Sequence, residues 1–230
     1  MTRALIFDFD GVIADSEMLV NGAMADNLTR LGLPTTREQS LAAFLGKRWP
    51  EVVALVEARL AAEGRSGTLP ATFADDLKAA IHARFHGELA EVSGARAFIR
   101  AHAHLPRAIA SSSSADRLAL CLDVLGLAKD FGPHVYSADL VTRGKPSPDI
   151  FLLAAEKLNT PPAGCIVIED SPGGIRAARA AGMTAIGLHA AAHLPDNHAQ
   201  ALKEAGAHHI AANWGEVHAL VTAILEQSSP

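Results

Sequence analysis

The sequence has few cysteines, few aromatic residues and no long hydrophobic run. Two cysteines, Cys121 and Cys165, occur in 230 residues. This is too few for a disulfide framework and fits two buried, free thiols in a reducing compartment. No apolar stretch approaches the roughly 18 residues of a membrane-spanning helix, and the N-terminus enters an apolar segment without a basic, cleavable leader. We therefore expect a cytoplasmic protein that does not contact a membrane.

Lysine is scarce as well, and the formal net charge is -5. The lysines are scattered along the chain, so they form no basic stripe that would bind a nucleic-acid backbone. Nucleic acid is therefore not an expected partner. With 49% hydrophobic residues, the chain can bury a sizeable core. Because no apolar stripe demands a partner chain, we expect a monomer.

Beyond residue 90, strand-like apolar segments alternate with amphipathic segments of helical length. This alternation predicts a parallel sheet covered by helices on both faces. Together with an N-terminal strand before Asp8, the expected strands are residues 107–110, 135–137, 165–168, 184–188 and 208–211.

Residues 15–90 instead carry four helical segments with no strand between them. Thr36 and Gln39 form the pattern of a capping box at the start of one helix, and Trp49 is expected in the core of this helical part. A run of helices does not belong inside an alternating layer. We therefore predict an α/β fold, with a Rossmann-like parallel-sheet core from residues 1–14 and 91–230 and an inserted helical domain from residues 15–90.

The N-terminal apolar strand runs directly into Asp8 and Asp10, which flank one phenylalanine and precede Gly11. Two carboxylates thus lie where a buried strand opens onto a loop. Burying unpaired carboxylates is unfavourable, so the pair indicates a bound cation, typically a hard metal ion held by oxygen ligands. The alternative is a solvated turn that uses Asp and Gly for their backbone tolerance.

Four serines follow the expected strand at residues 107–110 and precede a helix. The hydroxyl of Ser111 and the backbone N–H groups at the start of the helix, Ser112 included, can form an anion site. Ser113 or Ser114 is expected to cap the helix.

Lys145 and the acidic pair Glu169 and Asp170 complete the set of candidate site residues. Lys145 lies between Gly144 and Pro146 in a chain with few lysines, which favours a fixed anion contact over a solvated charge. Glu169 and Asp170 directly follow an apolar strand, although an ordinary surface acid remains an alternative for Glu169. Parallel sheets bind ligands at the carboxyl ends of their strands, so Ser111, Glu169 and Asp170 are expected to lie near the N-terminal carboxylates.

In this order, the segment from Asp8 to Val12, Ser111, the segment around Lys145 and the segment from Glu169 to Ser171 resemble the four motifs of the haloacid dehalogenase (HAD) superfamily. The resemblance spans the whole chain. The helical insertion resembles the cap domain of the first subclass of this superfamily. The motif sequences are similar to those of the branch that contains β-phosphoglucomutases and 6-phosphogluconate phosphatases.

The resemblance implies phosphoryl transfer with Asp8 as the nucleophile, which forms an aspartyl phosphate that water hydrolyses. Asp10 would act first as general acid and then as general base. Mg²⁺ is the implied cofactor, held by Asp8, Asp170 and the backbone carbonyl of Asp10, with Glu169 supporting these ligands. The implied phosphate contacts are Ser111, Ser112 and Lys145.

The expected function is hydrolysis of a small phosphate ester, a sugar or sugar-acid phosphate such as 6-phosphogluconate. A phosphosugar mutase is an alternative, but mutases of this branch carry a His where this chain has Met18 to Val20, and a cap Arg at the position aligned with Trp49. A non-catalytic binding module would require a broken site, whereas every motif residue is present. A dehalogenase would use neither Asp10 nor a metal held by Asp170.

Lys47 and Arg48 follow a helix break at Gly46 in the helical insertion. A cap loop that faces the core could use these two cations to bind a carboxylate or hydroxyl groups of the substrate. The alternative is a plain exposed loop.

A Lys47→Ala variant is expected to raise KM for an acidic sugar phosphate, because it removes a cation that would pair with the substrate carboxylate. Phosphate release measured over a range of substrate concentrations tests this. An unchanged KM would remove Lys47 from the substrate site.

Overall fold

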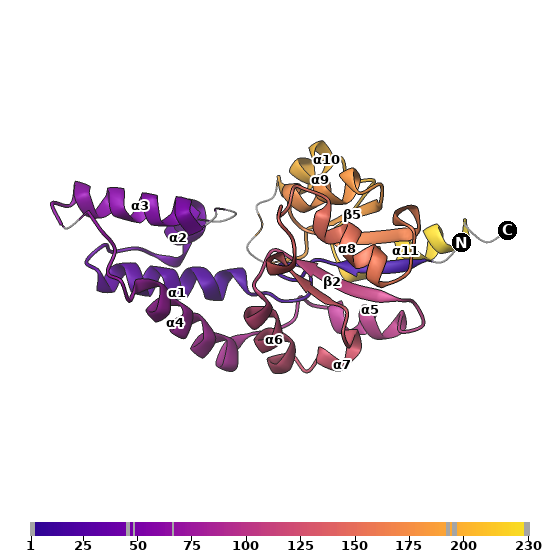
Figure 1. Ribbon diagram of the computed structural model, residues 1–230, viewed down its shortest axis with the longest axis horizontal. Coiled ribbons are helices and arrows are strands. Elements are labelled where there is room, and N and C mark those ends of the chain that lie inside the picture. The colour runs from indigo at the N-terminus through magenta and orange to yellow at the C-terminus, as the bar shows by residue number, and fades with distance from the viewer. Residues whose placement is uncertain are drawn as a thin grey trace. The chain divides into compact units, whose positions relative to one another are not determined.

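The computed structural model describes residues 3–44, 47, 49–65, 67–191, 194 and 197–227. The chain forms two compact units, one of Met1–Asp15 with Ala90–Pro230 and one of Ser16–Leu89. Strands alternate with helices in the first unit, and the second is helical (Figure 1). The helical unit is therefore an insertion between the first strand of the α/β unit and the rest of it.

A parallel sheet lies at the centre of the α/β unit. Among the described residues it has six strands in the order β3-β2-β1-β4-β5-β6. The strands are β1 (Ala4–Phe7), β2 (Arg107–Ser111), β3 (Val135–Ser137), β4 (Cys165–Glu169), β5 (Thr184–Leu188) and β6 (His209–Ala211). The chain builds outward from β1 to β3 and then returns to place β4 on the other side of β1, which creates a topological switch point between β1 and β4. This architecture confirms the predicted Rossmann-like α/β fold.

Strand β1 is apolar at every position and fully buried, as expected for a central parallel strand covered on both faces. It pairs with β2 and β4, with Phe7 opposite both Ile109 and Ile168. Glu169 is therefore level with Asp8. The register brings acidic residues from β1 and β4 to the same edge of the sheet.

Helices cover both faces of the sheet (Figure 1). They are α5 (Ala95–Ala101), α6 (Ala115–Val124), α7 (Ala128–Phe131), α8 (Asp149–Lys157), α9 (Pro172–Ala180), α10 (His198–Glu204) and α11 (Trp214–Glu226), with short 3₁₀ turns η1 (Ala138–Leu140) and η2 (Pro162–Gly164). Because successive side chains of a strand point to opposite faces, β1 contributes to two cores. Ala4 and Ile6 belong to a buried cluster with residues of α8, α9 and α10.

Phe7 is the aromatic centre of the other core. Its ring lies 6.1 Å from that of Phe98 on α5, 5.7 Å from Phe131 on α7 and 6.0 Å from Trp214 on α11, measured between centroids. Burial of such large side chains contributes about 1.5–3 kcal/mol each. This packing fixes β1 and thereby the residues that follow it.

The two connections to the helical unit run side by side at the edge of the α/β unit. The Asp15 amide donates to the Ala90 carbonyl at 3.0 Å, and the Val92 amide donates to the Ile13 carbonyl at 2.8 Å. Between these bonds, Ala14 and Glu91 form an antiparallel bridge. The chain thus leaves and re-enters the α/β unit at one place.

The helical unit consists, in its described part, of α1 (Glu17–Arg30), α2 (Arg37–Phe44), α3 (Trp49–Ala62) and α4 (Phe73–Glu88). Leu28, Val56 and Leu77 are among the residues of its buried cluster. The capping box before α2 is confirmed: the Thr36 amide donates to the Gln39 side chain at 2.8 Å, and the Gln39 amide donates to the Thr36 hydroxyl at 3.2 Å.

Trp49 does not lie in this core, and its assignment there was wrong. It is the first residue of α3, 43% exposed, with its ring stacked on Phe73 at 6.3 Å. At this end of α3 the ring packs on Phe73 and stays partly exposed.

Both cysteines are free and buried, as predicted. In the described part of the chain, no helix is long and apolar enough to cross a membrane.

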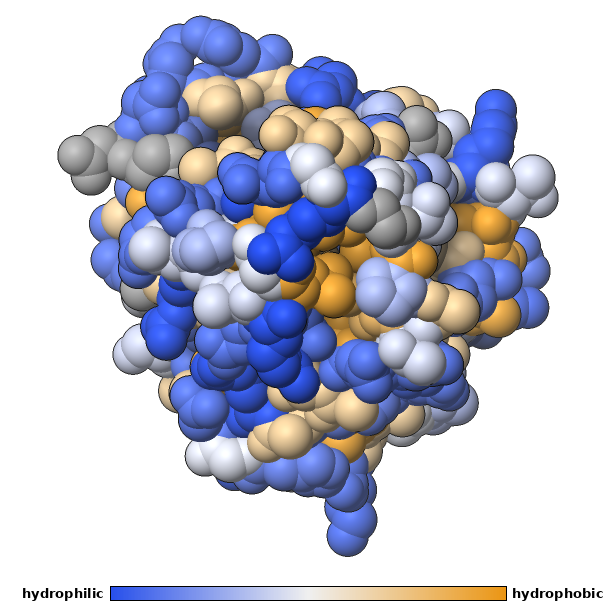
Figure 2. Space-filling view, turned by 90° about the vertical axis from the view of Figure 1, so that its left-hand side faces the viewer, coloured by the Kyte–Doolittle hydropathy of each residue, from blue (hydrophilic) through white to orange (hydrophobic). Residues whose placement is uncertain are grey.

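Hydrophilic residues prevail on the face shown in Figure 2, with a smaller group of hydrophobic residues among them. Of the described large hydrophobic residues, the exposed ones are Trp49, Leu55, Leu140 and Leu152.

His102, at the end of α5, makes stability sensitive to pH. It is 4% exposed, its ring lies 4.2 Å from Phe98, and His218 lies 5.0 Å away. Burial lowers the pKa of His102 below its ordinary value of 6.5, and His218 and His104 lower it further, against the opposing bond to the Phe98 carbonyl. The unfolded chain therefore binds this proton more tightly than the folded protein does.

His102→Gln is expected to flatten the dependence of stability on pH, because the contribution of His102 is complete above its unfolded pKa and declines as pH falls below it. Urea unfolding from about pH 7.5 to about pH 5.5 spans the titration of an ordinary histidine. Equal slopes of unfolding free energy against pH in variant and wild type would contradict this assignment.

Candidate active site

Asp8 is the first residue beyond β1. Its amide donates to the Ile168 carbonyl at 2.9 Å, which extends the pairing with β4 by one residue and fixes the Asp8 backbone. The side chain is buried, and its Oδ1 accepts a bond from Lys145 Nζ at 2.7 Å. Lys145 Nζ also lies 2.8 Å from Glu169 Oε1. One ammonium therefore links carboxylates that follow β1 and end β4.

The turn after Asp10 brings the chain close to Asp170. Gly11 has a φ of 76°, and its amide donates to the Ala14 carbonyl at 2.8 Å. A Cβ at this position would lie 1.9 Å from Asp170 Oδ2. Both the left-handed backbone and the missing side chain require glycine here. The glycine leaves space for the Asp170 carboxylate beside the turn.

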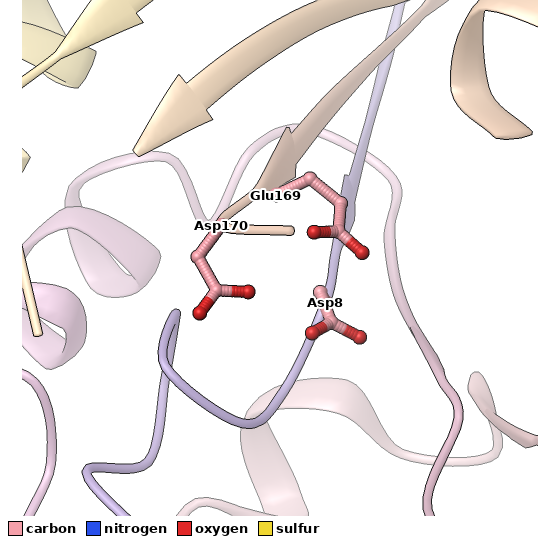
Figure 3. Close-up of side chains that lie close together, drawn as sticks. All are labelled: Asp8, Glu169 and Asp170. Carbon is pink, nitrogen blue, oxygen red and sulfur yellow. The ribbon is translucent and has the colours of Figure 1, made fainter. Parts of the chain in front are cut away.

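Asp8, Glu169 and Asp170 bring three buried carboxylates together (Figure 3). One ligand atom from each lies within 4.8 Å of the others. Among the described residues, no other group of three or more His, Cys, Asp or Glu side chains is arranged to hold a metal ion. Even with Lys145 beside it, the cluster carries excess negative charge. An all-oxygen donor set of this charge fits a hard divalent cation such as Mg²⁺.

Burial and the charges of this cluster shift two pKa values. Burial raises the pKa of Asp8 to about 7 against the opposing Lys145 ammonium, and the Glu169 carboxylate adds to the rise. Burial disfavours the charge on Lys145, but Asp8 and Glu169 outweigh it and raise the pKa of Lys145. Lys145 is therefore a permanent cation. Added positive charge near Asp8 favours its ionised form, which a nucleophilic carboxylate requires.

Glu169 is held from two sides and is fully buried. Its Oε1 accepts from Lys145, and its Oε2 accepts from the Ser171 amide at 2.6 Å. Ser171 caps α9, since its hydroxyl accepts from the Gly174 amide at 3.0 Å. A Cβ on Gly174 would lie 1.6 Å from Glu169 Oε1. The start of α9 is thus built to accommodate this carboxylate.

The serine run places Ser111 at the end of β2, where it is buried, and leaves Ser112 exposed. The Ser111 hydroxyl oxygen accepts from the Ser113 amide at 3.1 Å, so its O–H remains a donor. The expectation that a serine side chain caps α6 was wrong. Ser114 occupies the cap position without a side-chain bond, and the Ala115 amide donates to Asp139 Oδ2 at 2.9 Å.

The Asp10 carboxylate is bound by residues at the start of α6. Its Oδ2 accepts from the Ser113 hydroxyl at 2.6 Å, and its Oδ1 pairs with Arg117 Nη2 at 2.6 Å. Sequence reasoning did not identify Arg117. A signal existed, because a cation in the first turn of a helix opposes the helix dipole and therefore needs a carboxylate partner.

Three further residues, Lys47, Arg48 and His198, complete the comparison with the sequence. Lys47 is exposed in the helical unit, and Arg48 lies outside the described residues. His198, at the start of α10, hydrogen-bonds to the Asp170 backbone carbonyl, a contact that sequence reasoning missed because the two are remote in the chain. Asp8, Lys145, Glu169 and Asp170 therefore form one cluster, and Ser113 joins Ser111 to Asp10.

Comparison with known proteins decides the family. A family model described as haloacid dehalogenase-like hydrolase matches residues 2–182. The chain belongs to this family. Its membership confirms the resemblance read from the four motifs, and the HAD fold accounts for the switch-point position of the carboxylates.

Named relatives of this HAD chain include phosphatases. It is 31% identical over 182 residues to the fructose-1-phosphate phosphatase YqaB of Escherichia coli (strain K12), covering 79% of this chain and 94% of that protein. It is 27% identical over 182 residues to the 6-phosphogluconate phosphatase of the same organism, covering 79% and 80%. A putative beta-phosphoglucomutase from Thermotoga maritima matches with a TM-score of 0.80 and 28% identity, covering 97% and 100%. The chain is an enzyme, a phosphatase of the HAD family.

Gly174→Ala is expected to displace Glu169 from Lys145 and to lower both phosphatase activity and stability, the latter by about 1–3 kcal/mol as in other overpacked sites. Gly173→Ala is the matched control, because nothing lies within 4 Å of its added Cβ. It should retain activity and gain up to about 1 kcal/mol from its higher helix propensity. Urea unfolding and phosphate release measure both quantities. If the two variants behaved alike, the close contact with Glu169 would not matter.

Proposed function

We propose that this enzyme is a Mg²⁺-dependent phosphatase that hydrolyses small sugar or sugar-acid phosphates, such as 6-phosphogluconate, through an aspartyl phosphate on Asp8. The contact of Lys145 with both Asp8 and Glu169, beside Asp170, is the observation that carries this proposal. This arrangement supports a carboxylate nucleophile, a fixed cation and a metal-binding donor set at the switch point of the sheet.

Asp8, Asp170 and the backbone carbonyl of Asp10 would hold the metal, with Glu169 supporting them. When bound, Mg²⁺ supplies positive charge that offsets the repulsion between a carboxylate and a phosphate dianion. The three-carboxylate cluster supports the ligands Asp8 and Asp170. The part of the Asp10 carbonyl is inferred from the family resemblance and stays a prediction.

Asp8 attacks phosphorus with one carboxylate oxygen, and the bond from phosphorus to the sugar oxygen breaks. Asp10 gives a proton to the departing oxygen as general acid. Asp10 then takes a proton from water, which attacks the aspartyl phosphate, releases inorganic phosphate and restores the Asp8 carboxylate. Lys145 pairs with Asp8 and with the phosphate oxygens throughout.

Ser111 donates a hydrogen bond from its hydroxyl group to the phosphate. The geometry supports this role, because its oxygen already accepts the Ser113 amide and its O–H is left to donate. Ser112 would add its backbone N–H. These contacts position the phosphoryl group for in-line attack.

The helical unit is proposed to act as a cap domain, residues 15–90, that selects the substrate and excludes bulk water. Lys47 and Arg48 remain candidates for binding the non-phosphate part. Monomeric state and cytoplasmic location also remain predictions. The names of the relatives support sugar phosphates as the substrate class.

A phosphosugar mutase is the second candidate, favoured by the likeness to the Thermotoga maritima protein. Met18 to Val20 and Trp49 argue against it, because mutases of the resembled branch carry a His and an Arg there. The exposed Trp49 ring offers no charge for a second phosphate.

Phosphate release from sugar, sugar-acid and nucleoside monophosphates in the presence of Mg²⁺ tests the proposal. Release should fall to background in Asp8→Asn and after removal of metal by a chelator, and it should return when Mg²⁺ is restored. Conversion of glucose 1-phosphate to glucose 6-phosphate without net release would favour the mutase. Release that persists in Asp8→Asn would exclude Asp8 as the nucleophile.

A further inference from the structure

We propose that Arg117 is a positioning residue that orients Asp10 for proton transfer to the leaving group. The inference rests on the proposed function, in which Asp10 is the general acid. Arg117 acts through Asp10 and not on the substrate. The motifs that identify the family do not include this arginine, and its role follows from the contacts around Asp10.

Both oxygens of the Asp10 carboxylate are held from the same helix start. Ser113 donates to Oδ2 and Arg117 to Oδ1, each at 2.6 Å. A carboxylate with one donor can rotate about its terminal bond, whereas donors on both oxygens fix the plane of the group. The Arg117 and Asp10 side chains are only 23% and 16% exposed, so water competes weakly for these bonds.

The position of Arg117 indicates that this contact is specific. It is the third residue of α6, where the partial positive charge of the helix N-terminus disfavours a cation. The Asp10 carboxylate offsets this repulsion. Most of the Arg117 side chain is covered by the protein, since only 23% of it is exposed. The guanidinium is therefore held within the fold and is not a mobile surface group.

The same loop positions the phosphate contact. The Ser113 amide donates to the Ser111 hydroxyl, and the Ser113 hydroxyl donates to Asp10. Ser111, Ser113, Asp10 and Arg117 thus form one hydrogen-bonded chain. It sets where the phosphate lies relative to the acid that must reach the oxygen leaving that phosphate. Because proton transfer needs close approach and correct orientation, loss of Arg117 should impair it more than it impairs phosphate binding.

A comparison of leaving groups separates this role from a general structural one. The alkoxide of a hexose phosphate needs a proton as its bond to phosphorus breaks, whereas 4-nitrophenolate leaves without one. The ratio kcat/KM reports only steps up to the transfer of the phosphoryl group to Asp8. Later hydrolysis of the aspartyl phosphate, in which Asp10 acts on both substrates alike, does not enter it.

The experiment measures kcat/KM for a hexose phosphate and for 4-nitrophenyl phosphate, with Mg²⁺, in wild type, Arg117→Met, Arg117→Lys and Ser113→Ala. Arg117→Met should lose roughly 10- to 100-fold on the hexose phosphate and less than about 3-fold on the aryl ester, which is part of the typical contribution of general acid catalysis. Arg117→Lys should recover part of the loss. Ser113→Ala should also lose more kcat/KM on the hexose phosphate than on the aryl ester, but its loss should be smaller than that of Arg117→Met.

Arg100→Met is the matched control. Arg100 also pairs with an aspartate of the α/β unit, Asp130, at 3.7 Å, but it is 57% exposed and lies on α5. Arg100→Met should leave kcat/KM unchanged for both the hexose phosphate and 4-nitrophenyl phosphate. Circular dichroism and thermal unfolding check that each variant is folded. If Arg117→Met does not fold, the selectivity of Arg117→Lys and Ser113→Ala decides the question.

Equal losses on the two substrates would overturn the positioning role and make Arg117 a structural residue. No loss, or a gain, on the hexose phosphate would also overturn it, since the ion pair would then hold Asp10 away from its task. A wild-type protein that hydrolyses neither ester would refute the proposed function itself. An active wild type with unselective variants would refute the role of Arg117 alone.

Discussion

Three buried carboxylates share the carboxyl edge of the sheet with the ammonium of Lys145, and much of the surrounding structure keeps this charged group in place. Two glycines allow the close approaches that it requires: Gly11 beside Asp170 and Gly174 beside Glu169. The cap of α9 directs a backbone amide at Glu169. Burying these charges together is unfavourable without compensation. The free energy gained from the apolar packing around β1 must therefore offset the cost of burying the charged site.

The proposed function depends on the same imbalance. One ammonium cannot neutralise the three carboxylates, and the remaining negative charge fits a divalent cation, which would in turn attract a phosphate. Asp10 has different partners, a serine hydroxyl and a guanidinium on its two oxygens. Asp8 and Asp10, separated by one residue, thus have different hydrogen-bond partners, as the separate tasks proposed for them require.

The sequence was most informative where a general rule of folding decides position. Strand ends of a parallel sheet meet at one edge, so Asp8, Ser111, Glu169 and Asp170 could be predicted as neighbours from the pattern of strands and helices alone. The capping box of Thr36 and Gln39 was predictable because its partners are three residues apart. Lys145 was identified from its setting in a chain short of lysine.

Contacts between remote segments were beyond the reach of such rules. The amide at the start of α6 pairs with Asp139, which lies 24 residues away on the turn after β3, so local serine patterns gave the wrong cap. Arg117 was overlooked because a cation at a helix start indicates an acidic partner without identifying it, and the partner, Asp10, precedes Arg117 by 107 residues. Trp49 was misplaced because apolar character does not distinguish a core position from a helix end.

The paired connections at Asp15 and Ala90 have an evolutionary consequence. The chain leaves and re-enters the α/β unit at adjacent points. For the α/β unit, the inserted helices are therefore equivalent to a loop whose two ends are held together. Loop-closure entropy grows only slowly with length, so the α/β unit can tolerate insertions of many sizes at this junction. A chain built this way can exchange its helical module for another while the arrangement of strand ends that performs the chemistry stays intact.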